Sequence, residues 1–439
     1  MTLSFLNKKA CIRRSFWSFQ SFHCQGPYCE RVPSKSSSTW LNRFPQTSTM
    51  GAERQSSTKN DAQPGPVPQA PWATARPSPR DPSRRLPQAI AHRGAKLDWP
   101  ENTMAAFRGA VKAGAHAIET DIHISADGVA VISHVSQSSR FALHHGMLIT
   151  SITTWLTWLG SAQLTLEQDA SLKRCFGIDA RIGECSWEYL STLRTVAEPH
   201  EPMPRLKDFL QWLAQPKMQD IWVVLDIKLD DDPAELMAAI ARDLDGVQGP
   251  VPWDQRIILG CWNASFLQAA RSRLPTYPLA HISTSLLYSH HFLRVPNLGF
   301  NLNHKTLIGP SGRLFLRELR QTDKLLMTWT VNEPRHMEWC IRQNLCHPRR
   351  RNGKIEGPAL IDGVITDNPR LYLEMCEKFE NEMDGKLTRP KLALTERIRK
   401  KAEMVAVVIL TETLMMAYHV LRRMQGKFDF LRDRRSLDK

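Results

Sequence analysis

The chain has 439 residues and a formal net charge of +14 at pH 7. This excess of positive charge favours an anionic partner, either nucleic acid or an acidic membrane. The sequence contains no recognisable nucleic-acid-binding module, so we expect anionic phospholipid and no nucleic acid. The nine cysteines are odd in number and lack C-x-x-C spacing, which argues against a disulfide framework and predicts reduced thiols in an intracellular compartment.

Residues 1–86 are predicted to lie outside the folded core. The first fifty residues contain seven Lys or Arg and a single acidic residue, Glu30, a composition that resembles a mitochondrial presequence. Two other interpretations stay open: a disordered tail, or an upstream extension with translation beginning at Met50. No apolar segment typical of a secretory signal follows the early charges. The eight prolines between Pro64 and Pro87 predict an extended linker.

Residues 87–380 are predicted to form one α/β domain. Short apolar strand candidates alternate with helical patterns, for example Thr103 to Gly114 and Pro233 to Asp243, and this alternation favours a parallel sheet. A (β/α)8 barrel takes about 250 residues as a single unit, so the length fits one such domain with appendages. The eight strand candidates span residues 88–93, 117–124, 221–227, 256–261, 278–282, 298–302, 325–331 and 362–366.

Four reactive side chains come where short apolar strands leave this core. His92, Glu119, Asp121 and His134 occupy these positions, and parallel barrels keep their catalytic residues at such strand ends. Glu119 and Asp121 are two residues apart, so on an extended strand both face the same way. Paired carboxylates suit a hard divalent ion, Mg²⁺ or Ca²⁺. A metal ion with two imidazoles suits the cleavage of a phosphodiester.

Each of these residues alone is more often a surface or core group, and their order and spacing together are the specific signal. At these residues the chain resembles the glycerophosphodiester phosphodiesterase family, whose pattern runs His-Arg-Gly, Pro-Glu-Asn-Thr, Glu-x-Asp, Asp-Gly and a second His. Every element is present in order from His92 to His134, and the similarity covers about residues 87–375. Within the family, the chain most resembles the branch of phosphatidylglycerol phospholipases C.

The resemblance implies a TIM (β/α)8 barrel that holds one divalent metal ion. Its implied ligands are Glu119, Asp121 and Asp226. The family usually has Glu at the third of these positions. The shorter side chain of Asp226 implies a different distance to the metal ion or a different metal ion. The implied reaction is hydrolysis of phosphatidylglycerol to diacylglycerol and glycerol 3-phosphate.

The resemblance also implies roles for charged residues around the phosphate. One of His92 and His134 deprotonates the glycerol 2-hydroxyl, and the other protonates the leaving oxygen. Arg93 and Lys228 neutralise charge on the phosphate, because a cationic donor gains strength as that charge develops.

Two further residues are assigned to substrate binding. Trp329, at a strand end, walls the glycerol pocket or, in the alternative, belongs to the core. Glu101, with Asn102 beside it, holds the loop after the first strand and reaches toward the site.

Residues 135–168 are predicted to be an insertion. In the family an Asp directly follows the second His, whereas here Val135 follows His134 and the expected continuation begins at Asp169, after 34 further residues. Val135-Ser136-Gln137 can be encoded in the form of a 5′ splice donor, and Gln168 can end an acceptor. We therefore interpret the segment as an unspliced intron read as protein. The alternative is a genuine loop that covers the site, although long structureless loops are uncommon.

Residues 381–439 are predicted to form a basic, membrane-associated tail. Met404 to Leu421 is an 18-residue, mainly apolar run with Lys and Arg on both sides. A membrane span needs about 20 apolar residues and Glu412 adds a cost, so an interfacial helix on an anionic membrane surface fits better. The alternative is an amphipathic helix packed on the barrel. We expect a membrane-associated protein at the mitochondrion, endoplasmic reticulum or lipid droplet; no oligomeric state is indicated.

Two other functions stay open. A soluble glycerophosphodiester phosphodiesterase acting on deacylated lipids would share every catalytic residue and differ only in how it meets membranes. A catalytically impaired barrel that acts as a lipid-binding protein is supported by the interrupted pattern after His134.

Overall fold

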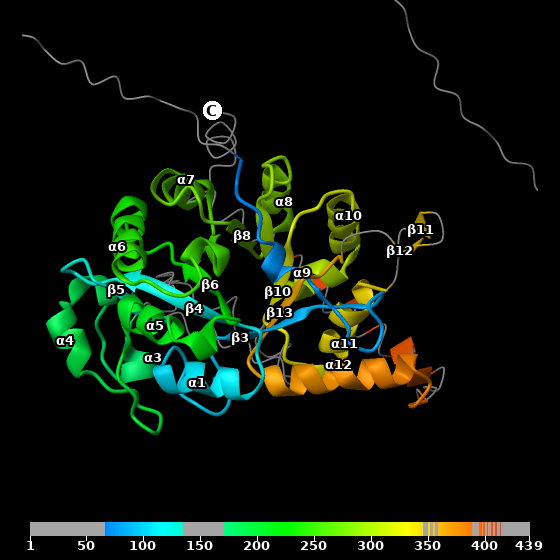
Figure 1. Cartoon of the computed structure of the whole chain (residues 1–439), viewed down its shortest axis with the longest axis horizontal. Coiled ribbons are helices and arrows are strands. Elements are labelled where there is room, and N and C mark those ends of the chain that lie inside the picture. Colours follow the sequence, from blue (N-terminus) through cyan, green and yellow to red (C-terminus); the bar gives the residue numbers. More distant parts are fainter. Residues whose placement is uncertain are drawn as a thin grey trace, which may run out of the picture. The chain divides into compact units, whose positions relative to one another are not determined.

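The computed structural model describes residues 66–134, 171–345, 350–351, 354–355 and 359–388, with separate positions between 395 and 413. All of them belong to the second of the two units into which the chain divides; the first, Met1–Asp61, lies outside the described residues. The predicted presequence and the predicted insertion at 135–168 also lie outside them. The elements named below are labelled in Figure 1.

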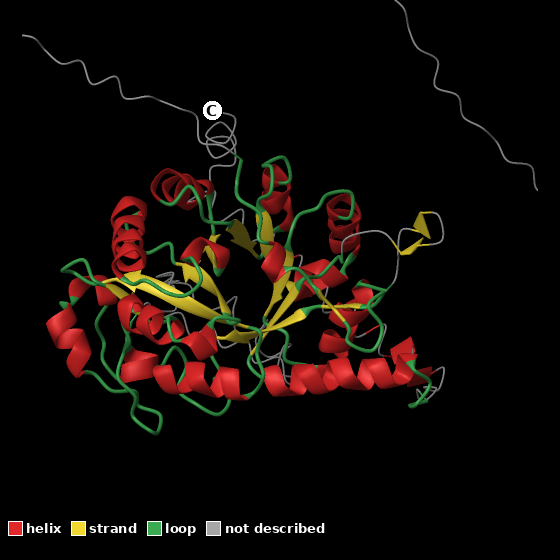
Figure 2. Ribbon diagram, viewed as in Figure 1, coloured by secondary structure: helices red, strands yellow, loops and turns green. Residues whose placement is uncertain are grey.

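Eight parallel strands form the centre of the domain: β3 (Gln88–His92), β4 (Ala117–Ile124), β6 (Trp222–Ile227), β7 (Ile257–Cys261), β8 (Leu279–Ser283), β9 (Gly299–Asn303), β10 (Leu326–Trp329) and β13 (Gly363–Thr366). They run in the order β3-β13-β10-β9-β8-β7-β6-β4, and pairing of β3 with β4 closes the barrel. The predicted TIM barrel and its strand candidates are confirmed. Figure 2 shows the strands with helices around them.

The helices that surround the strands are α1 (Met104–Lys112), α3 (Lys173–Phe176), α4 (Trp187–Thr192), α5 (Leu206–Leu213), α6 (Pro233–Gly246), α7 (Ala264–Arg273), α8 (Leu286–Ser289), α9 (His304–Ile308), α10 (Pro310–Leu319), α11 (Pro334–Gln343) and α12 (Pro369–Met383). The start of α6 illustrates how the sequence places them. Asp232 accepts hydrogen bonds from the backbone N–H groups of Ala234 and Glu235. Pro233 takes the first helical position, where a missing N–H costs nothing.

Smaller elements complete the described chain. Strand β5 (Ala130–Ile132) pairs antiparallel with β4, and two further antiparallel pairs join β1 (Arg76–Pro77) to β2 (Arg85–Leu86) and β11 (Arg350–Arg351) to β12 (Lys354–Ile355). Short 3-10 helices are η1 (Pro71–Ala73), η2 (Ile182–Glu184), η3 (Pro216–Met218), η4 (Trp253–Gln255) and η5 (His290–Phe292).

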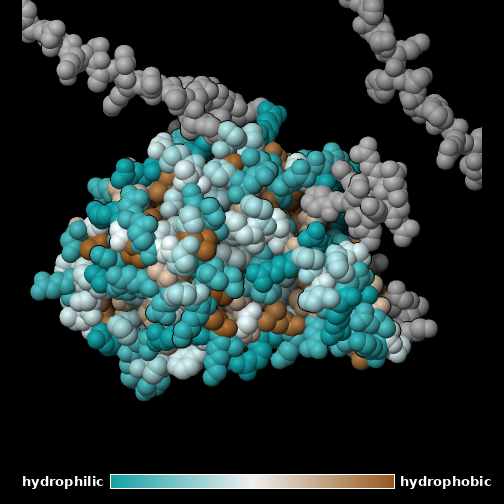
Figure 3. All heavy atoms as spheres, viewed as in Figure 1, coloured by the Kyte–Doolittle hydropathy of each residue, from teal (hydrophilic) through white to brown (hydrophobic). Residues whose placement is uncertain are grey.

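Side chains alternate along the strands between two apolar layers. In β6, Trp222 and Val224 belong to the layer inside the barrel, whereas Val223 and Leu225 belong to the layer between strands and helices. This is the period of two expected for a strand buried on both faces. The outer face in Figure 3 is mostly hydrophilic, with apolar residues scattered over it.

The segment from residue 66 to 86 corrects the predicted domain boundary. We expected residues up to 86 to lie outside the core, but Ala73 is fully buried in the layer inside the barrel. The Trp72 ring contacts the Trp222 ring edge-on at 5.3 Å, and Gln88 Nε2 donates to the Trp72 carbonyl at 2.8 Å. Because Trp222 and Gln88 begin their strands, this segment covers the N-terminal end of the barrel.

The same segment is fixed to the last barrel helix. Arg84 forms an ion pair with Asp384 at 2.6 Å, and the buried Ser78 hydroxyl donates to Glu380. The proline-rich segment is therefore packed against the barrel. The fixed φ of proline suits such a packed segment as well as a free linker.

The predicted membrane-associated helix lies largely outside the described residues. Within Met404 to Leu421 only scattered positions are described, as helical, and the exposed ones include the apolar Val405 and Ile409. Among the described residues, no helix has the length and apolar character needed to cross a membrane. The tail remains a prediction.

Candidate active site

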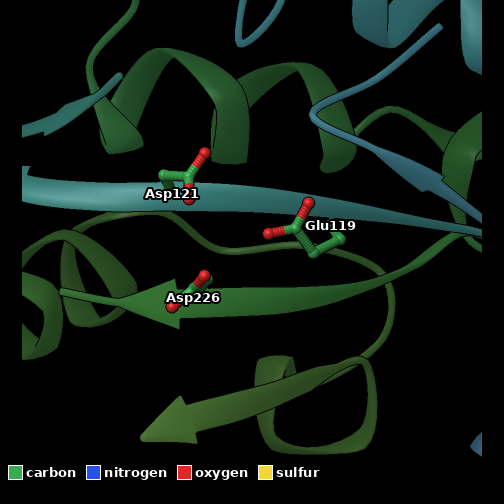
Figure 4. Close-up of side chains that lie close together, drawn as sticks. All are labelled: Glu119, Asp121 and Asp226. Carbon is green, nitrogen blue, oxygen red and sulfur yellow. The ribbon is translucent and has the colours of Figure 1, made fainter. Parts of the chain in front are cut away.

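The carboxyl ends of β3, β4 and β6 bring the predicted metal ligands together. His92 lies opposite Glu119 in the pairing of β3 with β4, and Asp121 lies opposite Asp226 in the pairing of β4 with β6. One ligand oxygen from each of the three carboxylates lies within 4.8 Å of the others. In Figure 4 the three side chains lie close together on two neighbouring strands. Among the described residues this is the only group of its kind.

The acidic group is buried and carries uncompensated negative charge. Burial, with the nearby Asp121 and Asp226, raises the pKa of Glu119 well above its usual value. Burial also raises the pKa of Asp226, against the opposing effect of Lys228. For Asp121 the effect of burial is outweighed by Lys228 and Arg93, and its pKa is well below the usual value. Three carboxylates therefore face two cations.

Arg93 and Lys228 are the two cations. Lys228 Nζ lies 2.6 Å from Asp121 Oδ1 and also contacts Asp226. Arg93 Nε lies 3.1 Å from Asp121 Oδ2, and its backbone N–H donates to Glu119 at 3.0 Å. Both cations therefore lie among the three carboxylates, and their role in neutralising charge on the phosphate stays a prediction.

A tight turn after His92 sets the position of Arg93. Arg93 has a φ of 58° and Gly94 a φ of 85°, so the chain passes through the left-handed region twice in succession. A Cβ on Gly94 would lie 2.7 Å from the backbone of Ala106. The glycine of the His-Arg-Gly motif is therefore required by backbone conformation and by close approach of α1.

His92 is held by a carboxylate that the sequence did not assign to the site. Its Nδ1 lies 2.6 Å from Asp367 Oδ1, and Asp367 in turn contacts Lys96 at 3.2 Å and accepts from Asn332 Nδ2 at 2.7 Å. His92 Nε2 lies 4.0 Å from Glu119 Oε2. Burial and the adjacent Arg93 lower the pKa of His92 to about 4, so the ring is neutral at neutral pH.

His134 reaches the site through the β4–β5 hairpin. The hairpin folds the chain back on β4, and the Ser133 N–H donates to the Asp121 carbonyl at 3.2 Å. Arg174 Nη2 lies 3.0 Å from His134 Nδ1. A guanidinium only donates, so this nitrogen of His134 is the acceptor. Burial and Arg93 lower the pKa of His134 well below its usual value.

Glu101 is fully engaged by protein cations. It contacts Arg93 at 3.0 Å and Arg174 at 2.6 Å. Despite its burial, these charges lower the pKa of its carboxyl far below the usual value. Its neighbour Asn102 donates to Asp121 Oδ2 at 2.8 Å. Both residues therefore contact other site residues, and the substrate-binding role assigned to Glu101 stays a prediction.

A cavity of about 150 Å³ lies between the two histidines, the two cations and two of the carboxylates, Glu119 and Asp226. Trp329 lines it, and Trp262, which sequence reasoning missed, contacts Trp329 at 5.7 Å between ring centroids. That Trp329 walls a glycerol pocket stays a prediction. Trp262 Nε1 donates to Asp226 Oδ1 at 2.7 Å. The lining residues are His92, Arg93, Glu119, His134, Asp226, Lys228, Trp262, Ile282, Asn301, Trp329, Thr330 and Ile365.

A larger hollow of about 310 Å³ adjoins the loop from Lys96 to Glu101. It contains Arg174 and Glu101 but none of the three acidic ligands. Glu119, Asp226 and both histidines line the smaller cavity instead.

Comparison with known proteins gives the same family. The model of the glycerophosphoryl diester phosphodiesterase family matches residues 92–371. A glycerophosphodiester phosphodiesterase from Caldanaerobacter subterraneus subsp. tengcongensis is 25% identical over 296 residues, which cover 66% of this chain and 97% of that protein. Human glycerophosphodiester phosphodiesterase 1 is 54% identical over only 52 residues, 12% of this chain and 16% of that protein.

Solved structures of similar proteins include a glycerophosphodiester phosphodiesterase from Thermotoga maritima, with 17% identity, a TM-score of 0.43 and coverage of 66% of this chain and 98% of that one. An Oleispira antarctica phosphodiesterase in complex with sn-glycerol-3-phosphate has 17% identity, a TM-score of 0.45 and coverage of 66% and 97%. The family match spans more than half of the chain. The chain therefore belongs to the glycerophosphoryl diester phosphodiesterase family, whose enzymes are phosphoric diester hydrolases that use a divalent metal ion.

Proposed function

We propose that this chain hydrolyses a glycerophosphodiester with one divalent metal ion held by Glu119, Asp121 and Asp226. The main support is the buried acidic trio, of which Glu119 and Asp226 line one cavity together with His92 and His134. Its excess of negative charge fits a cation. Asp121 Oδ1 makes no hydrogen bond of good geometry, although Lys228 Nζ is near. All-oxygen ligands favour Mg²⁺ or Ca²⁺, which would polarise the phosphate when bound.

The hydrogen bonds of the two histidines support opposite roles for them. A carboxylate accepts, so His92 Nδ1 donates its proton to Asp367 and Nε2 keeps a free lone pair. His92 is then the base that takes the proton of the glycerol 2-hydroxyl as this oxygen bonds to phosphorus. His134 Nδ1 lies beside the Arg174 guanidinium, so Nε2 is the nitrogen that is left to donate. In its imidazolium form, which the negative charge of a bound phosphodiester favours, His134 is then the acid that protonates the leaving alcohol as the phosphorus–oxygen bond breaks.

The two cations stabilise the transition state of the first step, and water hydrolyses the intermediate in the second. Arg93 and Lys228 face the charge that develops on the phosphate oxygens. Attack by the 2-hydroxyl gives a cyclic phosphate of glycerol, and the same two histidines, with roles reversed, let water open it to glycerol phosphate.

A change of leaving group tests this assignment. For glycerophosphoglycerol, whose leaving alkoxide needs a proton, His134→Ala should lower kcat roughly 100-fold to 10,000-fold. The loss should be far smaller for the p-nitrophenyl diester of glycerol phosphate, because p-nitrophenolate leaves without a proton. His92→Ala should impair both substrates alike. The opposite pattern for the two variants would reverse the assignment.

For the leaving group itself we propose the diacylglycerol of phosphatidylglycerol. Two apolar side chains on the loop that leads from β3 to α1 support a lipid substrate: Leu97 is 64% and Trp99 40% exposed, and both line the hollow beside the site. The names of the relatives favour the alternative, a deacylated glycerophosphodiester. Hydrolysis of phosphatidylglycerol vesicles against soluble glycerophosphoglycerol, followed by phosphorus NMR, decides between them. Binding to vesicles without hydrolysis of either substrate would favour the impaired, lipid-binding barrel.

We also propose that the basic tail beyond residue 385 holds the protein on anionic membrane. Truncation there should leave hydrolysis of dispersed substrate intact and weaken co-sedimentation with phosphatidylglycerol vesicles. The weakening should be greatest at low salt, because surface charges are screened over about 8–10 Å at physiological salt. Unchanged binding would favour the soluble enzyme.

A further inference from the structure

One polar atom in the wall of the catalytic cavity is left without a partner. Asn301 is 3% exposed, and its side-chain Oδ1 makes no hydrogen bond to any described residue. A buried amide oxygen without a partner costs free energy, and native proteins rarely leave one unpaired away from a functional site. Asn301 lines the cavity that also contains His92 and His134.

The strand itself directs Asn301 inward. Its neighbours in β9, Phe300 and Leu302, are buried in the apolar layer between strands and helices. Because side chains alternate along a strand, Asn301 belongs to the opposite face, inside the barrel. It lies opposite Ile282 of β8 in the register, and Ile282 lines the same cavity.

The two indole N–H groups of this wall are already used by the protein. Trp329 Nε1 donates to the backbone carbonyl of Asn301 at 3.0 Å, and Trp262 Nε1 donates to Asp226 at 2.7 Å. The two indoles and Ile282 therefore present mainly apolar surface to the cavity. The Asn301 amide oxygen is the acceptor left over for a ligand among these wall residues.

The size and lining of the cavity fit a small polyol. A cavity of about 150 Å³ is close to one that holds benzene, and glycerol has about as many non-hydrogen atoms. The lining includes two of the three carboxylates, Glu119 and Asp226, with both cations, where a phosphate belongs. It also includes indole surface for carbon atoms and, at Asn301, an acceptor for a hydroxyl.

We propose that Asn301 is a specificity-determining residue that accepts a hydrogen bond from the terminal hydroxyl of the glycerol unit retained on the phosphate. The proposal rests on the proposed phosphodiesterase function and deepens it: the central hydroxyl reacts, and the terminal hydroxyl is what the pocket recognises. An alcohol without this hydroxyl would leave the Asn301 oxygen unpaired, so the site should discriminate against it.

A pair of substrates tests the proposal. One is the p-nitrophenyl phosphodiester of glycerol; the other is the same ester of propane-1,2-diol, which keeps the reacting hydroxyl and lacks the terminal one. We expect the whole chain, with Mg²⁺, to prefer the glycerol ester in kcat/KM by roughly tenfold to a hundredfold, the effect of one buried hydrogen bond. Asn301→Leu, which is similar in size, should abolish this preference.

Two variants serve as controls. Ile282→Val changes the same wall without a polar group, so it should affect both esters alike and keep the preference. Asn301→Asp keeps an acceptor oxygen and should also keep the preference, even where activity on both esters falls. If Asn301→Leu lowers kcat/KM for both esters by the same factor, Asn301 has a structural role only and the proposal is wrong.

A binding measurement separates this proposal from the proposed function. If the wild-type chain hydrolyses neither ester, the phosphodiesterase function fails. Calorimetric titration with glycerol 1-phosphate and with propane-1,2-diol 1-phosphate, in Mg²⁺, then tests Asn301 alone. We expect the wild-type chain to bind the glycerol compound more tightly by the same factor and Asn301→Leu to bind both equally. Equal affinities in the wild-type chain would overturn the proposal.

Discussion

Glu119 is the residue at which stability and function make opposite demands. Its carboxylate is buried beside two others, and burial and their charges raise its pKa well above the usual value. The charged form is therefore disfavoured in the folded protein unless a cation is bound. The same concentration of carboxylates is what fits the group to the proposed metal ion.

The variant Glu119→Gln should therefore gain stability and lose function. Without metal, the raised pKa means that Glu119 must take up a proton on folding; the neutral amide avoids this cost and can still accept from the Arg93 N–H. We expect the melting temperature in excess chelator to rise by roughly 2 °C, and hydrolysis with metal to fall at least about 1000-fold.

Glu184→Gln, on the exposed turn η2, is the matched control and should change neither quantity. A melting temperature for Glu119→Gln below that of the wild-type chain, or activity near wild type, would contradict the account of this site.

Most of the predicted site residues could be found from sequence because they follow short apolar segments and their order matches a family pattern. His92 ends β3 as expected, whereas Glu119 and Asp121 lie within β4, which continues to Ile124 to pair with β5. Asp367 follows β13 in the same way, but its role needs the barrel to close, which pairs β13 with β3. Asn301 sits in the middle of an apolar strand, and only the fold shows that its side chain has no partner.

At the scale of elements, the β4–β5 hairpin and α3 are the two flanks of the predicted insertion. His134 ends the described part before residues 135–168, and α3 follows them. The two flanks meet, since Arg174 Nη2 lies 3.0 Å from His134 Nδ1. The segment between them lies outside the described residues.

Deletion of Val135 to Gln168 should therefore raise or restore activity. It joins His134 to Asp169 and recreates the uninterrupted family pattern, and the flanks it connects already lie together. Turnover of glycerophosphoglycerol by the shortened and the full chain, with circular dichroism as a folding control, measures the effect. A shortened chain that misfolds, or that is less active than the full chain, would show that the segment is a genuine element.

The N-terminal segment could not be assigned from composition. Eight prolines between Pro64 and Pro87 are typical of a linker, and a proline-rich segment packed on a barrel has the same composition. Ala73 is buried, and Trp72 contacts Trp222, because the segment covers the N-terminal end of the barrel. This surface exists only once the eight strands have closed, so composition alone cannot reveal the packing.

Two truncations test the corrected boundary. Removal of residues 1–65 should leave the melting temperature unchanged. Removal of residues 1–87 should lower it by on the order of 5 °C or more, because it exposes the barrel end and removes the Arg84–Asp384 ion pair. Equal melting temperatures for the two shortened chains would mean that the segment contributes nothing to stability.

At the scale of the whole molecule, buried neutral histidines link stability to pH. Burial lowers the pKa of His281 to about 3 and that of His116 to about 4; for His304, burial followed by the neighbouring His336 lowers the pKa to about 4. In the unfolded chain a histidine has a pKa of about 6.5. Below that pH the unfolded chain binds protons that the folded chain does not, so these groups lower the free energy of unfolding as the pH falls toward 4.

His281→Leu isolates this effect. The ring stacks on Phe292 with centroids 4.1 Å apart, so an apolar side chain suits the site. We expect the stability of the variant relative to the wild-type chain to increase by about 1.4 kcal/mol per pH unit between pH 6 and 4, measured by urea unfolding. A difference that does not change with pH would show that His281 is not buried in its neutral form.

The central claim is that catalysis depends on a divalent cation at Glu119, Asp121 and Asp226. Its most direct test follows the hydrolysis of glycerophosphoglycerol by the whole chain with phosphorus NMR, before and after removal of metal by excess chelator. We predict that chelation abolishes release of glycerol phosphate, that excess Mg²⁺ or Ca²⁺ restores it, and that Asp121→Asn is inactive under all conditions while remaining folded. Full turnover in excess chelator would contradict the account.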